Sequence, residues 1–192
     1  MSSRPSERRA TVPVKTLPDY LRPGLRVLSI GLNPSLRSVE AGFYFANPRN
    51  RFWPALLESG LAPAHLEPGA EAVRVLFEEH GIGFTDVVKR PSTGSASLRA
   101  ADFKRFAPLL RDKLVRYRPQ VAWFHGKQAF DGYLRYAQRR ETCRGWGEQP
   151  PIAGCRVFVT PNPSPANAAY SQAVITDWYR RLADFTGIAH LG

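Results

Sequence analysis

Four short apolar segments recur along the chain, at residues 25–32, 83–88, 121–125 and 156–160. The first is a continuous apolar run, which is typical of a β-strand that is covered on both faces of a sheet. The other three segments are of similar length and also indicate strands. The pattern therefore predicts four strands, distributed over most of the sequence.

Residues with helix-capping character lie between the first two strand segments. Asn50 caps a helix that begins just after it, Pro54 falls in the first turn of that helix, and Gly60 fits its end. Pro68 opens a second helix, which ends at Gly81. The pattern thus predicts two helices before the second strand.

The second half of the chain alternates in the same way. Phe103 and Phe106 indicate a short helix, and Pro108 starts another. A helix follows Lys127, and Ser171 caps the last one. In that last helix the apolar positions at helical spacing are Val174, Ile175, Trp178, Leu182 and Phe185.

Strands that alternate with helices imply a mainly parallel sheet with helices on both faces. We expect a three-layer α/β/α fold with four to five strands. The length of 192 residues suits one domain, which we place at residues 16–192. Residues 1–15 are rich in Ser, Arg and Pro and are expected to form a disordered basic arm, which is either a solvated tail or a nonspecific contact to DNA phosphates.

The charge of the chain narrows the class of partner. Lys and Arg number 27 against 16 Asp and Glu, which gives a net charge of +11. This excess favours a polyanionic partner, nucleic acid first, although an unspecialised basic protein has the same charge. No apolar run reaches the roughly 20 residues that span a bilayer, so we expect no membrane association and a cytoplasmic location.

The two cysteines exclude several cofactors. Cys143 and Cys155 form no CxxC pair and have no histidines at zinc-site spacing. They are too few for an ordinary iron–sulfur cluster, so we expect two free thiols. Neither GxGxxG nor GxxxxGK[ST] occurs, which disfavours a small-molecule enzyme that binds phosphate.

Two Asn-Pro-Ser segments, at residues 33–35 and 162–164, directly follow the first and fourth strand segments. Both look like sharp turns at the carboxyl ends of strands. In an open α/β sheet, ligands bind at that edge. We therefore expect the two turns to meet over one pocket.

The residues around the first turn bring in a family resemblance. Residues 31–35 followed by 42–53 closely resemble the mismatch-specific uracil-DNA glycosylases, the MUG/TDG branch of the uracil-DNA glycosylase superfamily. Residues 85–91, 126–129 and 162–164 are similar to further landmarks of that branch, in the same order. The resemblance implies an α/β/α fold, no metal and no cofactor. It also implies hydrolysis of the N-glycosidic bond of uracil, and often of related damaged bases, in mismatched double-stranded DNA, which leaves an abasic site.

The resemblance also assigns roles to single residues. Asn33 matches the residue that positions the attacking water, and Phe45 matches the aromatic that stacks on the flipped base. Leu32 lies where the family offers backbone groups to the base or the water. Asn162 stands where the most active branch has a histidine that stabilises the leaving uracil anion. Without the motif, the two asparagines would be read as turn formers and Phe45 as a core residue.

The second loop matches the segment that the family inserts into the vacated base stack. Pro165, Ala166 and Asn167 occupy it, and Asn167 is placed to hydrogen-bond the widowed base. Ala166 is a small wedge, which puts strong mismatch selectivity in doubt. We expect DNA phosphate contacts from Ser35 and Ser164. Lys127 is a further phosphate ligand or else a solvated residue of the first helical turn.

Asp86 departs from the resemblance, since close relatives do not carry an acid there as a rule. One reading is a carboxylate that activates water or stabilises the cationic sugar. The other is a strand-end acid paired with Lys89 or Arg90, or an Asp that caps a turn, and the sequence favours neither reading. The other arginines near the motifs, Arg49 and Arg51, are expected to be solvated.

The favoured function is thus a monofunctional DNA glycosylase of base excision repair, acting as a monomer. The alternative is a noncatalytic module on the same fold that binds DNA lesions or nucleic acid. The presence of both Asn33 and Phe45 favours the enzyme.

Overall fold

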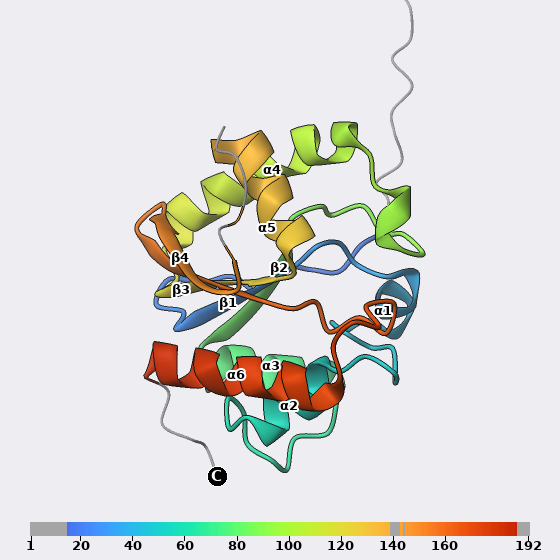
Figure 1. The fold of residues 1–192 in the computed structure, drawn as a ribbon, viewed down its shortest axis with the longest axis vertical. Coiled ribbons are helices and arrows are strands. Elements are labelled where there is room, and N and C mark those ends of the chain that lie inside the picture. The colour runs from blue at the N-terminus through green and yellow to red at the C-terminus, as the bar shows by residue number, and fades with distance from the viewer. Residues whose placement is uncertain (1–14, 139–142, 144, 188–192) are drawn as a thin grey trace, which may run out of the picture.

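A five-stranded sheet forms the centre of the protein (Figure 1). The computed structural model describes residues 15–138, 143 and 145–187, so the predicted arm at 1–15 lies outside it except for Lys15. The strand order is β2-β1-β3-β5-β4, in which β4 alone pairs antiparallel. The strands are β1 (Val27–Gly31), β2 (Ile82–Asp86), β3 (Val121–His125), β4 (Gly147–Ile152) and β5 (Cys155–Thr160).

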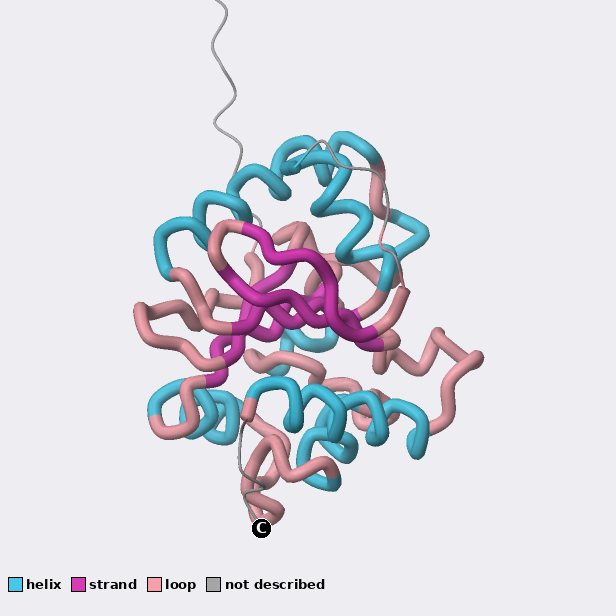
Figure 2. The backbone as a smooth tube through the Cα atoms, turned by 60° about the vertical axis from the view of Figure 1, so that its left-hand side comes forward, coloured by secondary structure: helices cyan, strands magenta, loops and turns pink. Residues whose placement is uncertain are grey.

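Helices cover both faces of the sheet, which confirms the predicted three-layer fold (Figures 1 and 2). One layer contains α2, α3 and α6, and the other contains α4 and α5. A short helix, α1, follows the first Asn-Pro-Ser turn. The helices are α1 (Leu36–Ala41), α2 (Phe52–Glu58), α3 (Ala70–Glu78), α4 (Ala100–Tyr117), α5 (Lys127–Tyr133) and α6 (Gln172–Thr186), with a 3₁₀ turn η1 (Ser95–Ser97) and a π-helical segment η2 (Leu134–Gln138).

The strands are buried on both faces, as the continuous apolar pattern predicts. Every residue of β1, β2 and β3 is buried. Side chains of successive strand residues point to opposite faces, so Val27 joins the core under α2, α3 and α6 while Leu28 joins the core under α4 and α5. The sheet therefore separates two apolar cores.

Helix α4 corrects the prediction of two helices around residue 108. It is one continuous helix of 18 residues with Pro108 inside it. Proline removes one backbone hydrogen bond and costs roughly 3 kcal/mol in a helix interior. Burial offsets this cost, because Phe103, Ala107, Leu110 and Leu114 all lie in the core beneath the helix.

Other differences also follow from tertiary packing. Strand β4 was not predicted because Pro150 and Pro151 interrupt it. Its place at the edge of the sheet accommodates these prolines, because proline lacks an N–H and the outward-facing N–H positions of an edge strand need no partner strand. Helix α1 was missed although Ser35 caps it and Gly42, at φ 79°, ends it. In α6, Val174 was expected to point inward but is 39% exposed.

The pairing register places the functional loops. Gly31 pairs with Asp86, and His125 pairs with Thr160, so β1, β2, β3 and β5 all end at the same level. Because these four strands are parallel, the loops that follow them meet at one edge of the sheet.

Candidate active site

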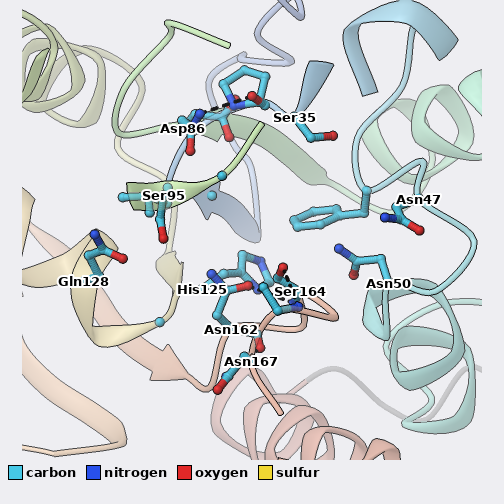
Figure 3. A pocket seen from close by; sticks show the side chains of 18 of the residues that line it. Ser35, Asn47, Asn50, Asp86, Ser95, His125, Gln128, Asn162, Ser164 and Asn167 are labelled. Carbon is cyan, nitrogen blue, oxygen red and sulfur yellow. Dashed lines mark hydrogen bonds between the residues drawn. The ribbon is translucent and has the colours of Figure 1, made fainter. Parts of the chain in front are cut away.

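A pocket of about 640 Å³ opens at this edge of the sheet (Figure 3). Its wall is formed by the loops that follow β1, β2, β3 and β5 and by the segment between α1 and α2. All the site residues predicted from the sequence line it: Leu32, Asn33, Ser35, Phe45, Asp86, Lys127, Asn162, Ser164, Pro165, Ala166 and Asn167.

Hydrogen bonds orient the side-chain amide of Asn33. Its Nδ2 lies 2.8 Å from Ser92 Oγ and 3.2 Å from the carbonyl oxygen of Arg90. Ser92 is itself held beside the first turn, because its N–H donates to the carbonyl of Pro34. These two acceptors fix the position of Asn33 Nδ2. No described residue donates a hydrogen bond to Asn33 Oδ1. The amide oxygen is thus left as an acceptor for a small polar ligand such as water.

The side chain of Asp86 packs against the backbone of Gly31. A methyl group placed on Gly31 would lie 2.5 Å from Asp86 Oδ1, so only glycine leaves room for the carboxylate. Asp86 is 3% exposed and its Oδ2 is 3.5 Å from Lys89 Nζ. The expected pairing with Lys89 is thus present, and the same carboxylate lines the pocket. Arg90 turns away and binds Asp102 with two hydrogen bonds.

Burial changes the charge of Asp86 near neutrality. Removal from water raises the pKa of this carboxyl from 3.8 to about 6, against the opposing attraction of Lys89. A carboxyl with this pKa is ionised at pH 7 yet can accept and release a proton close to that pH, as a general base requires.

Phe45 is held in a strained conformation. Its φ is 58°, a left-handed value that non-glycine residues rarely adopt. The ring stacks on Phe52 with centroids 3.9 Å apart and planes 13° apart, and it also makes an edge contact with the ring of His125, with centroids 5.1 Å apart. Backbone strain at a pocket wall is a common sign of function, and here it presents a flat aromatic surface to the pocket.

His125 is a site residue that sequence analysis missed. It is 1% exposed, with Ser29 Oγ 2.8 Å from Nε2 and Tyr179 Oη 3.4 Å from Nδ1. Burial lowers the pKa of the imidazole to about 3, so the ring is neutral at physiological pH. The sequence signal that could have identified it is its position as the last residue of a predicted strand, because ligands bind at the carboxyl ends of strands.

The second Asn-Pro-Ser loop is shaped by its own polar groups. Asn162 Oδ1 accepts a hydrogen bond from the Ser164 N–H, and Asn167 Nδ2 donates to the carbonyl of Asn162. Asn162 Nδ2 has no partner among the described residues, so this nitrogen is free to donate to a ligand. Asn162 also packs against Gly126, where an added Cβ would lie 3.1 Å from Asn162 Cβ.

Arg51 holds this loop in place, which contradicts its expected solvation. Its guanidinium donates to the carbonyls of Pro163, Ser164, Asn167 and Tyr170, and its backbone N–H also donates to Pro163. Charged donors make the stronger hydrogen bonds in proteins. One side chain from the start of α2 therefore fixes the whole turn between β5 and α6.

Further polar residues complete the pocket. Lys127 Nζ lies 4.7 Å from the ring centre of Trp146, a cation–π contact between two residues that both line the pocket. Asn47 and Asn50 line the pocket as well. Sequence analysis treated Asn50 only as a helix cap, but the N-cap residue of α2 is Arg51, and Asn50 Oδ1 accepts a hydrogen bond from the Phe52 N–H.

Comparison with known proteins identifies the family. The model of the family described as the uracil DNA glycosylase superfamily matches residues 18–184. The chain belongs to the uracil DNA glycosylase superfamily. The solution structure of a protein from Methanosarcina acetivorans, provisionally assigned as a uracil DNA glycosylase, shares the fold with a TM-score of 0.57 and 21% identity, over 88% of this chain and 97% of that chain.

Membership in the superfamily indicates DNA glycosylase chemistry with DNA as the partner. Among the described residues of this superfamily member, no group of three or more His, Cys, Asp and Glu side chains is placed to hold a metal ion. Both cysteines are free thiols, as predicted. Within the same residues, no helix is long and apolar enough to cross a membrane.

Replacement of Arg51 by lysine should loosen the second loop of this glycosylase. Lysine keeps the charge but cannot reach several carbonyls at once, and losing a hydrogen bond from a charged group costs about 1.5–3 kcal/mol. We expect a melting temperature lower by several degrees. The control is Arg49→Lys, at an exposed position nearby, which should change stability by less than about 0.5 kcal/mol.

A methyl group on Gly31 should displace the Asp86 carboxylate. We expect Gly31→Ala to reduce DNA base excision by at least about tenfold, because active-site geometry tolerates little displacement. Gly94→Ala is the matched control, since Gly94 also lines the pocket, has φ −178° and has no atom within 4 Å of an added Cβ. Equal activity of the two variants would contradict the steric role of Gly31.

The free energy of unfolding should reveal the raised pKa of Asp86. The folded state holds the carboxyl proton of Asp86 more tightly than the unfolded chain does. The cost of ionising Asp86 therefore develops as the pH rises from about 4 to 6, is complete above pH 6 and is absent below about pH 4. Asp86→Asn should therefore raise stability above pH 7, by up to about 3 kcal/mol for two pKa units, with a gain that disappears as the pH falls. Urea titrations at pH 8 and pH 4, with exposed Asp184→Asn as the control, measure this difference.

Proposed function

We propose that this protein is a monofunctional glycosylase of the mismatch-specific, MUG/TDG-like kind, which removes uracil and related damaged pyrimidines from duplex DNA. The observation that carries the proposal is the convergence of Asn33, Phe45, Asp86 and Asn162 on one pocket in a member of the superfamily. The net charge of +11 suits a DNA substrate.

The base must leave the DNA stack before any protein group reaches its glycosidic bond. Phe45 offers the stacking surface for the extruded base, and Phe52 supports the opposite face of the ring. Stacking of a base on an aromatic side chain contributes about 1–3 kcal/mol, which helps to offset the loss of stacking in the duplex.

The chemical step needs an oriented water more than a strong nucleophile. Asn33 Oδ1 accepts a hydrogen bond from the water and directs its oxygen toward C1′ of the sugar. As the new C–O bond forms, the bond from C1′ to the base breaks and its electron pair leaves with the base. Asp86 accepts the proton of the water, and its negative charge stabilises the positive charge that develops on the sugar.

The departing base carries negative charge. The free Nδ2 of Asn162 donates a hydrogen bond to a carbonyl oxygen of that base. A neutral amide stabilises an anion less than a cationic donor does, so we expect slow turnover and a preference for bases that leave easily.

The segment Pro165–Ala166–Asn167 faces the gap that the extruded base leaves. Ala166 is exposed and small, so it offers little apolar surface in exchange for the lost stacking. The Nδ2 of Asn167 is engaged within the loop, which leaves Oδ1 to accept a hydrogen bond from an opposing guanine. We therefore expect a weaker dependence of the rate on the opposite base than a large apolar wedge would give.

A single assay tests the proposal. The protein is incubated in excess with duplexes that carry uracil opposite guanine or adenine, and with single-stranded uracil DNA, after which alkali cleaves any abasic sites. We expect cleavage of the guanine-paired duplex. DNA binding without cleavage of any substrate would instead favour a noncatalytic lesion-binding module.

Single-turnover rates test the role of Asp86 in the same assay. Asp86→Asn should slow excision by about 10²–10⁴-fold, the usual range for the loss of a general base. The control is Asp177→Asn, which removes an exposed carboxylate on α6 that pairs only with Arg180 among the described residues. An unchanged rate for Asp86→Asn would rule out Asp86 as the group that activates water.

A further inference from the structure

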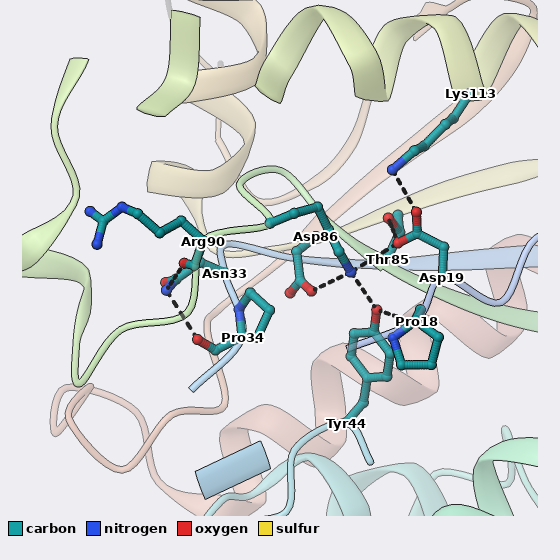
Figure 4. A network of polar contacts seen from close by, with 10 residues as sticks. Pro18, Asp19, Asn33, Pro34, Tyr44, Thr85, Asp86, Arg90 and Lys113 are labelled. Carbon is teal, nitrogen blue, oxygen red and sulfur yellow. Dashed lines mark hydrogen bonds and ion pairs between the residues drawn. The ribbon is translucent and has the colours of Figure 1, made fainter. Parts of the chain in front are cut away.

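A line of alternating charges connects Asp86 to the outer helix α4 (Figure 4). Lys113 Nζ on α4 lies 2.6 Å from Asp19 Oδ2, and Asp19 Oδ1 lies 2.9 Å from Lys89 Nζ. Lys89 Nζ in turn lies 3.5 Å from Asp86 Oδ2. The line joins the segment before β1, the loop after β2 and helix α4.

The ammonium group of Lys89 is the centre of this line. Besides the two carboxylates it donates to Tyr44 Oη at 3.1 Å, so each of its three N–H bonds has a partner. The Lys89 side chain is 14% exposed. Neither Lys89 nor Asp19 is among the residues that line the pocket, so both act on a ligand only through their neighbours.

We propose that Lys89 and Asp19 are positioning residues that act in opposite directions on Asp86, and that their balance sets the pH at which the enzyme becomes active. The proposal rests on the function proposed above, in which the ionised Asp86 accepts a proton from water. Lys89 attracts the carboxylate and stabilises it, whereas Asp19 repels it and also competes for the same ammonium group.

The environment of Asp86 contains few other charges. Besides Lys89 and Asp19, Lys113 acts on it more weakly among the described residues, and the neutral phenol of Tyr44 lies beside it. Arg90, the next residue after Lys89, is committed to Asp102. Burial alone would raise the pKa of Asp19, but Lys89 and Lys113 outweigh it and keep that pKa below its ordinary value. Asp19 is therefore a fixed negative charge over the working pH range.

Lys89 also links the acid to the stacking surface. Tyr44 immediately precedes Phe45, and its hydroxyl is fixed between Lys89 and the carbonyl of Pro18. One ammonium group thus ties the residue that is proposed to activate water to the loop that is proposed to hold the base. Arginine has a larger, planar head group that does not fit three partners around one nitrogen.

The test is the pH dependence of single-turnover excision, measured from pH 4.5 to 9 on the guanine-paired uracil duplex. The rate of the wild-type protein should rise through a midpoint near pH 6 as Asp86 ionises. Lys89→Met should move that midpoint up by at least about one pH unit, because a nearby opposite charge lowers a carboxyl pKa by 1–3 units. Asp19→Asn should move it down.

Controls separate this effect from a general loss of structure. Lys104→Met removes an exposed lysine at the outer surface of α4 and should leave the midpoint unchanged. Damage to the fold lowers the rate at every pH but does not move the midpoint in opposite directions for two variants. The proposal predicts an upward shift of the midpoint for Lys89→Met and a downward shift for Asp19→Asn, so either variant tests it if the other does not fold.

A second measurement makes the proposal independent of activity. The ¹³C resonance of the Asp86 carboxyl reports its ionisation directly, and its midpoint should shift in the same directions in the two variants. If wild type excises uracil and Asp86→Asn abolishes the rise with pH, but neither variant moves either midpoint, the proposal is overturned while the proposed function stands. If no substrate is cleaved, the proposed function fails, and the carboxyl resonance still decides whether Lys89 and Asp19 control Asp86.

Discussion

The parallel pairing of β1 with β2 and β3 is the constraint on which the site depends. It brings the ends of strands that are far apart in sequence to one edge, and its register sets Gly31 directly beside Asp86. The absence of a side chain on Gly31 then admits the carboxylate into the wall of the pocket. A shift of one residue would turn every side chain of a strand to the opposite face and remove the acid from the pocket.

The pocket combines neutral hydrogen-bonding groups with one buried acid. Asn33 and Asn162 supply an acceptor and a donor whose orientations are set by bonds to their own loops. Neither amide changes its charge, whereas the raised pKa of Asp86 lets its carboxyl bind or release a proton close to neutral pH. Its pKa of about 6 is the result of burial opposed by Lys89, and this balance depends on residues outside the pocket.

Rigid support surrounds these groups. The ring of Phe45 is held against Phe52 despite a left-handed backbone, and Arg51, which directly precedes Phe52, binds the loop that contains Asn162. The start of α2 therefore supports both Phe45, the proposed stacking surface, and the loop that contains Asn162. This arrangement favours preorganisation, in which few groups need to move when the substrate binds.

Local signals in the sequence determined four of the five strands, most of the helices and the loops that carry the site, because turn residues and apolar runs act over a few positions. The motif residues Asn33, Phe45 and Asn162 were therefore found without the structure. Tertiary contacts decided the rest: burial keeps α4 continuous through Pro108, the sheet edge admits β4, and Arg51 finds its partners more than 100 residues away. The charge of Asp86 is the clearest case, because its burial, its pairing with Lys89 and its repulsion by Asp19 exist only in the folded chain.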